Sequence, residues 1–210
     1  MEIPLSSWLL PALGFATAIS ATPGPNNVMV AASGATYGFS RTVPHILGIS
    51  AGFPLMLGIV AVGAAGPLRA WPWLHEVLRW VGVAYMLWLA WQIGTAEPVV
   101  TTDASRARAR ARGRPMTFLQ AALFQWVNPK AWVAAGGTVI TYLTASGAAF
   151  WVQAALLGAI FVLASMAFVS IWTAIGAGVA RVLRTPRSLR RSNVAMAALL
   201  VLSVGTLFWE

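Results

Sequence analysis

The chain has 210 residues, of which 59% are hydrophobic and only 9% are charged, and its formal net charge is +9. A soluble domain carries about a quarter charged residues, so this composition predicts an integral membrane protein. The sequence has no cysteine, and its two histidines are far apart, so we expect no disulfide, no metal site and no cofactor.

Six apolar stretches are long enough to cross a bilayer as helices, which takes about 20 residues. We expect these spans at about 7–32, 44–65, 77–95, 117–142, 149–177 and 192–209. The run 9–21 has the apolar character of a signal peptide, but no basic residues precede it, so we expect it to remain as part of the first span. The sequence therefore predicts an all-α integral membrane fold with six transmembrane helices.

The arginines fall mainly on one set of the loops between these spans. Eleven lie in loops that must share one side of the membrane: Arg41, Arg106, Arg108, Arg110, Arg112, Arg114, Arg181, Arg184, Arg187, Arg190 and Arg191. Only Arg69 and Arg79 lie on the other side, so the first set is expected in the cytoplasm and both termini outside. The arginines lack interleaved aromatic residues, so no nucleic acid is expected as a partner. Binding of anionic lipid by the basic loop at 105–114 stays open beside its role in topology.

Two of the predicted spans are interrupted by polar and helix-breaking residues. The first contains Thr22-Pro23-Gly24-Pro25-Asn26-Asn27, and the fourth contains Asn128-Pro129-Lys130. Proline removes a backbone donor, and in lipid an unsatisfied backbone group costs several kcal/mol. Such interruptions survive only where protein or a watery cavity receives them, so we expect both to face one polar site.

The two interrupted spans also carry the signal of an internal repeat. The stretches 30–34 and 133–137 match closely at an offset of 103 residues, which aligns the two interruptions. Each half then has three spans, and an odd number of spans inverts the second half in the membrane. We expect one transporter domain over 1–210, with a first repeat at about 1–95, a cytoplasmic linker at about 96–115 and a second repeat at about 116–210.

These motifs resemble those of the LysE/RhtB family of amino-acid exporters. The resemblance rests on the stretch 21–26, on the glycines Gly34, Gly38 and Gly48, and on Phe124-x3-Asn128-Pro129-Lys130-Ala131-Trp132. It implies a protein that is not an enzyme, in a bacterial-type plasma membrane. It also implies efflux of amino acids or close derivatives, driven by a proton or electrical gradient.

The chemistry of the two motifs fits a zwitterionic cargo. Half-helices that begin after the interruptions present free N–H groups to a carboxylate, and Lys130 adds a cation. Backbone carbonyls and amide oxygens can accept from an ammonium group. The candidate substrate-binding residues are Thr22, Gly24, Pro25, Asn26, Asn27, Asn128, Pro129 and Lys130. The alternative is that the prolines only kink the helices and the asparagines only join them.

No aspartate or glutamate lies in any predicted span, so Lys130 has no acidic partner there. A second cation would be repelled, and we therefore expect a neutral amino acid between apolar walls formed by Met29, Phe53, Met56, Phe124 and Trp132. Lys130 and His45 are candidates for proton coupling. Two alternative functions are a passive channel and an exporter of another small polar solute or cation. Assembly as a homo-oligomer stays open.

Overall fold

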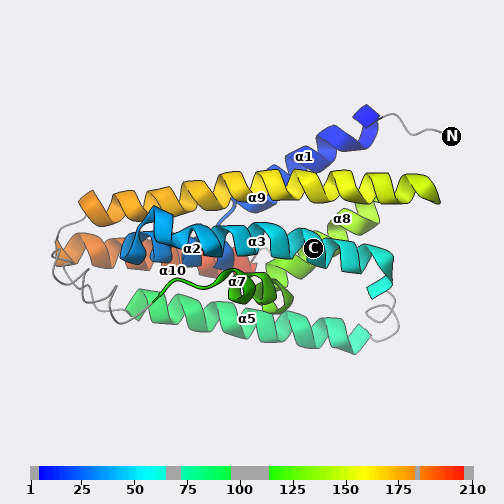
Figure 1. Cartoon of the computed structure of the whole chain (residues 1–210). Helices are drawn as coiled ribbons and strands as arrows, with labels where there is room; N and C mark the ends of the chain where they lie inside the picture. Colours follow the sequence, from blue (N-terminus) through cyan, green and yellow to red (C-terminus); the bar gives the residue numbers. More distant parts are fainter. Residues whose placement is uncertain (1–4, 65–71, 96–113, 183–184, 206–210) are drawn as a thin grey trace.

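The computed structural model describes residues 5–64, 72–95, 114–182 and 185–205, and this part of the chain contains only helices (Figure 1). The helices are α1 (Leu5–Ala21), α2 (Pro25–Tyr37), α3 (Phe39–Ile59), η1 (Val60–Ala64), α5 (Pro72–Thr95), α7 (Phe118–Phe124), η2 (Gln125–Val127), α8 (Pro129–Tyr142), α9 (Ala148–Val182) and α10 (Pro186–Gly205). The expected all-helical fold is confirmed.

Both predicted interruptions occur, and each splits a helix in two. The first break consists of residues 22–24 between α1 and α2, and the second of residues 125–128 between α7 and α8. Each following half-helix begins with a proline at its first position, where the missing N–H has no intrahelical partner to lose. The second break begins three residues earlier than predicted, because 125–127 form a turn of 3₁₀ helix.

Three predicted boundaries are wrong at their N-terminal ends. Helix α3 begins at Phe39 and contains Pro44, because Gly38, with φ 84°, makes the turn that separates it from α2. Helix α5 begins at Pro72, and α10 begins at Pro186. Proline at the first helical position sets both starts, and the arginines at 187–191 lie in the first two turns of α10 instead of in a loop.

Helix α9 is the longest element and runs beside α3 for much of its length (Figure 1). It packs against α1, α2 and α3, while α3 packs against α7, and α5 packs against α10. Within the described residues, the helical segments 39–63 and 148–179 are long and apolar enough to cross a bilayer. The segments 8–21 and 118–127, which lead into the two breaks, are shorter apolar helices.

Glycines allow α3 and α7 to approach closely. A Cβ atom at Gly48 would collide with the carbonyl oxygen of Phe118, and one at Gly52 would lie 2.6 Å from the Cα of Ala122. The small-residue face formed by Gly48 and Gly52 is therefore in contact with α7, and it fixes the helix that leads into the second break.

A second pair of glycines brings α2 against α9 in the same way. A Cβ atom at Gly34 would collide with the carbonyl oxygen of Thr173, and one at Gly176 would collide with that of Ala31. Small residues on both helices thus let the two backbones touch. The helix that follows the first break is held along α9 by this contact.

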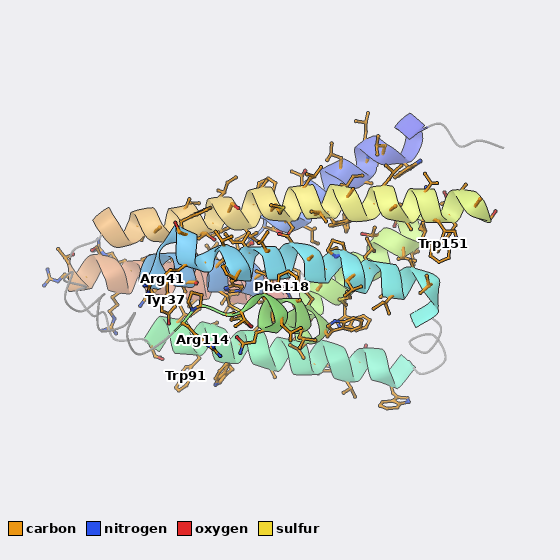
Figure 2. All side chains as sticks on the ribbon, in the orientation of Figure 1. Tyr37, Arg41, Trp91, Arg114, Phe118 and Trp151 are labelled. Atoms are coloured by element: carbon orange, nitrogen blue, oxygen red, sulfur yellow. The ribbon has the colours of Figure 1, made fainter. Side chains whose placement is uncertain are left out.

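Exposed arginines and an exposed tryptophan mark opposite ends of the helices. Arg41 and Arg114 lie at one end of the helices, near Tyr37 and Trp91, whereas Trp151 lies at the opposite end (Figure 2). Both arginines are exposed. The basic linker, including the stretch 105–114 for which lipid binding was left open, lies outside the described residues except for Arg114 and Pro115.

Candidate functional site

A cavity of about 60 Å³ lies between the two breaks. Its lining combines polar groups of both breaks with apolar side chains of α3 and α9: Ile19, Ser20, Gly24, Pro25, Asn26, Asn27, Ile49, Phe53, Gln125, Asn128, Lys130, Ala131, Ala134, Phe161, Ser165 and Val169. One water needs about 10–15 Å³ of such space, so there is room for roughly four to six waters or a small polar solute. Ser165 is equally distant from both ends of α9, so the cavity lies at the middle of that helix.

The backbone carbonyls at the end of α1 are occupied by side chains. Nδ2 of Asn27 donates to the carbonyl oxygens of Ser20 at 2.9 Å and of Thr22 at 2.8 Å. The Thr22 hydroxyl donates to the Ile19 carbonyl at 3.1 Å. A helix end leaves carbonyls without intrahelical partners, and here short polar side chains of the same interrupted helix supply the donors.

Lys130 crosses from the second break to the first. Its Nζ donates to the carbonyl oxygen and to Oγ1 of Thr22, both at 2.8 Å, and to the carbonyl oxygen of Pro23 at 3.2 Å. An ammonium group has three donors, and three acceptors of the first break surround it. In place of an acidic partner, Lys130 thus has two backbone carbonyls and one hydroxyl of the first break.

Helix α9 contributes a further donor to the same region. Nε1 of Trp172 donates to the carbonyl oxygen of Ala21 at 3.2 Å. The start of α2 differs, since Gly24 at its N-cap makes no side-chain hydrogen bond to the helix. Glycine has no side chain, so the N-cap residue of α2 offers no cap to the backbone N–H groups of Asn26 and Asn27, which lie beside the cavity.

The second break is closed by its own residues. Oδ1 of Asn128 accepts from the backbone N–H of Lys130 at 3.2 Å, which caps the start of α8. Nε1 of Trp132 donates to the carbonyl oxygen of Trp126 at 2.9 Å. These bonds join residues within six positions of one another, so the backbone around Asn128 is held by local contacts.

Gln125 is a site residue that the sequence interpretation missed. Its side chain is fully buried, and it forms a reciprocal amide pair with Asn26 on α2: Asn26 Nδ2 donates to Gln125 Oε1 at 2.9 Å, and Gln125 Nε2 donates to Asn26 Oδ1 at 3.2 Å. Gln125 Nε2 also donates to the Ala121 carbonyl at 3.0 Å. The available signal was a glutamine inside an apolar span, only three residues before Asn128.

The structure brings most of the expected residues together. Gly24, Pro25, Asn26, Asn27, Asn128 and Lys130 line the cavity, and Thr22 contacts Lys130. Pro129 is buried at the start of α8. His45 is buried on α3, where its Nδ1 has no hydrogen-bond partner among the described residues, and it is not part of the cavity lining. Of the five expected apolar wall residues, only Phe53 lines the cavity.

A comparison with known families matches residues 17–209 to a family described as LysE type translocator. The chain belongs to this family. It is therefore a membrane protein of a translocator family, and the resemblance noted in the sequence is confirmed.

The LysE type match is accompanied by similarity to cysteine/O-acetylserine efflux proteins. That of Salmonella typhimurium LT2 is 35% identical over 128 residues, which is 60% of this chain and 61% of the relative. That of Escherichia coli K12 is 34% identical over 124 residues, 58% of this chain and 59% of the relative. The aligned segments thus span about three fifths of these relatives. No solved structure matches the chain.

Two amide atoms in this LysE type translocator are available at the cavity. Oδ1 of Asn27 and Nδ2 of Asn128 are not engaged by any other described residue, although the other amide atom of each side chain is. One is an acceptor and the other a donor, so the cavity offers both kinds of group to a zwitterion. Lys130 is the only charged residue of the lining.

Proposed function

We propose that this protein exports neutral amino acids or close derivatives from the cytoplasm, in the chemical class of cysteine and O-acetylserine that its relatives' names carry. The observation that carries the proposal is the cavity between the two breaks, which combines both kinds of hydrogen-bonding group with one cation and no lining carboxylate. Its size suits a small solute better than a bulky one.

In this proposal the carboxylate of the cargo binds at the start of α2. The N–H groups of Asn26 and Asn27 lie at the positive end of a helix without a side-chain cap, which favours an anion. Nδ2 of Asn128 supplies a donor from the other half of the chain. Oδ1 of Asn27 is an acceptor for the cargo ammonium, and Ile49, Phe53 and Phe161 form the wall for an uncharged side chain.

Charge selects against lysine and arginine as cargo. A cationic side chain in the cavity would lie near Lys130 and would find no carboxylate among the lining residues. Two like charges about 6 Å apart cost roughly 3 kcal/mol at an effective dielectric constant of about 20. That is more than about a hundredfold in binding, enough to favour a neutral amino acid.

We further propose the fold of an inverted 3+3 repeat with six transmembrane spans, one domain over 1–210 and both termini outside. Equivalent elements of the two halves make equivalent contacts: α1 packs on α9 as α7 packs on α3. Ser50 of α3 and Ser165 of α9 meet through their hydroxyls at 3.3 Å beside the cavity. These pairings are those expected of two halves related by a pseudo-twofold axis.

Two sets of hydrogen bonds between the halves suit an alternating-access mechanism driven by a gradient. The amide pair of Asn26 and Gln125 joins α2 to the end of α7, on the proposed cytoplasmic side of the cavity. Lys130 joins α8 to the end of α1 on the opposite side. Opening one set at a time would expose the cavity alternately, with H⁺ as the coupling ion and Lys130 and His45 as its candidate carriers.

The proposal is tested by efflux from proteoliposomes loaded with labelled cysteine, O-acetylserine, threonine or lysine. We expect efflux of at least one neutral compound to exceed that of lysine, and faster efflux of lysine than of every neutral compound would contradict the proposal. Stimulation of efflux by unlabelled cargo on the opposite side identifies a carrier, whereas a passive channel would show none.

The orientation is tested with single cysteines, because the chain has none of its own. Ser40 and Ser146 are both exposed. Ser40 adjoins Arg41, and Ser146 lies five residues before Trp151, and these two labelled residues lie at opposite ends of the helices (Figure 2). In intact cells an impermeant maleimide should label Ser146→Cys and leave Ser40→Cys unlabelled until the membrane is opened. The reverse pattern would invert the proposed topology.

A further inference from the structure

The acceptors around the Lys130 ammonium form a defined cluster. Thr22 contributes its carbonyl oxygen and Oγ1, and Pro23 contributes its carbonyl oxygen, all within 3.2 Å of Nζ. Both carbonyls lie just beyond the end of α1, where the helix dipole places partial negative charge. The cluster is therefore a cation site assembled from neutral groups, and its three acceptors match the three N–H donors of a primary ammonium group.

The first break is shaped around the side chain that fills this cluster. Gly24 lies against Lys130, and a Cβ atom there would come within 2.9 Å of Cδ and 3.1 Å of Nζ. The absence of a side chain at this position leaves a passage for the lysine stem between the cavity and the cluster. A small primary amine would find the same passage if the stem were removed.

The cargo of the proposed function carries the same chemical group as Lys130. Its ammonium has three N–H donors, of which Oδ1 of Asn27 can accept from one, and no carboxylate lines the cavity to receive the others. The three-acceptor cluster beside the cavity is filled by Lys130 in this structure. When Lys130 leaves, its cation can pair with the cargo carboxylate, since Lys130 itself lines the cavity.

We infer that the Thr22–Pro23 oxygen cluster is a binding site for a primary ammonium group, held by Lys130 in this structure and taken over by the cargo ammonium during transport. Lys130 then turns to the cargo carboxylate, and the cavity keeps the same net charge before and after the exchange. The ligand site rests on the geometry alone, whereas the exchange with cargo rests on the proposed function.

The site is tested without any transport measurement. Lys130→Ala removes the atoms of an n-propylammonium ion, so this ion should bind the purified variant and raise its Tm by about 2–4 °C at a few times its Kd. Tetramethylammonium, a cation without N–H donors, should have no such effect, and neither ion should stabilise the wild type. The additional change Thr22→Val, which removes the hydroxyl acceptor, should weaken the propylammonium effect. Equal shifts in wild type and variant, or no shift in a folded variant, would overturn the inference.

A second measurement needs no variant, because Lys130 is the only lysine in the sequence. In protein labelled with ¹⁵N at lysine Nζ, a single side-chain resonance should report the cluster, and binding of a neutral cargo should shift it. Reductive methylation of Lys130 should become several-fold faster with cargo bound. A resonance and a methylation rate that do not change at saturating cargo would rule out the exchange. If no amino acid is transported but propylammonium still stabilises Lys130→Ala, the proposed function fails and the site stands.

Discussion

The two breaks of this translocator are built from similar residues but are held in place by different means. In the first, the carbonyls from residue 19 to residue 23 accept hydrogen bonds from side chains on three helices besides the break itself: Asn27 on α2, Lys130 on α8 and Trp172 on α9. In the second, Asn128 caps its own helix and Trp132 closes the turn from within α8. Two of the three partner side chains of the first break, Lys130 and Trp172, are thus more than a hundred residues away. The two bonds that close the second break span six residues or fewer, and its Gln125 side chain pairs with Asn26 in the other half.

In the proposed transport mechanism, this difference gives the two breaks different parts. A break closed by local bonds is a rigid platform, and it projects Gln125 and Lys130 toward the other half of the chain. A break held by distant donors changes its surroundings whenever one of those donors moves. The first break should therefore be the element whose hydrogen bonds are exchanged during transport, while the second keeps its shape.

Replacement of Lys130, which joins the two breaks, should cause the largest loss of export. Lys130→Met keeps much of the side-chain volume and removes all three bonds to the first break. Hydrogen bonds from a charged group contribute about 1.5–3 kcal/mol each, so the loss of even one would slow export roughly 10–100-fold. The measurement is initial efflux at matched abundance in the membrane. Arg114→Met, which removes an exposed cation, is the control and should export normally. Undiminished export by Lys130→Met would remove Lys130 from the mechanism.

The next largest loss is expected when the amide pair of Asn26 and Gln125 is broken, because this pair is the second set of hydrogen bonds between the halves. Gln125→Leu fits the buried volume but leaves the amide of Asn26 without its partner, at a cost of about 1–3 kcal/mol. We expect efflux to fall by about tenfold, less than for Lys130→Met. In a double-mutant cycle, adding Asn26→Leu to Gln125→Leu should cost little more than either change alone. Fully additive losses would show that the two side chains act separately.

Both breaks could be located from the sequence, because proline, glycine and asparagine together interrupt an apolar helix and leave backbone groups that lipid cannot satisfy. The choice of partners could not be read in the same way. Lys130 was expected to bring a cation to the site, and it does line the cavity, but its contact with the end of α1, more than a hundred residues away, could not be named from the sequence. A side chain of that length can reach several acceptors, and only the packing of α1 against α8 and α9 decides which one it reaches.

Gln125 is a second residue whose partner could not be predicted from the sequence. Its position in an apolar span marks it as unusual, but its pairing with Asn26 depends on how α2 and α7 approach one another. Helix boundaries were missed for a local reason, since Pro44 lies within α3 instead of before it, and Gly38 makes the turn. Prolines are tolerated inside membrane helices when neighbouring groups compensate, so a proline alone does not set an end.

Removing the local cap of the second break should have a smaller effect. Asn128→Ala deletes the acceptor for the N–H of Lys130, and loss of such a cap costs about 0.5–2 kcal/mol of stability. We expect a lower Tm with efflux reduced severalfold. Asn128→Asp keeps the cap oxygen and should restore Tm, but it loses the Nδ2 donor proposed for the cargo carboxylate, so its efflux should stay low. Restoration of efflux by the aspartate would mean that Asn128 serves only the helix start.

The smallest loss of efflux should follow removal of the Trp172 N–H, which α9 donates to the end of α1. Trp172→Phe keeps an aromatic ring and removes only the N–H that binds the Ala21 carbonyl at 3.2 Å. The glycine contacts between α2 and α9 remain in place, and Asn27 and Lys130 still hold the adjacent carbonyls, so the first break should keep its position. The net contribution of one neutral hydrogen bond is about 0.5–1.5 kcal/mol, which predicts a two- to tenfold loss of efflux. Trp151→Phe is the matched control, because Trp151 is exposed at the far end of α9 and should be unaffected (Figure 2). A loss as large as that of Lys130→Met would mean that α9, and not the lysine, sets the geometry of the first break.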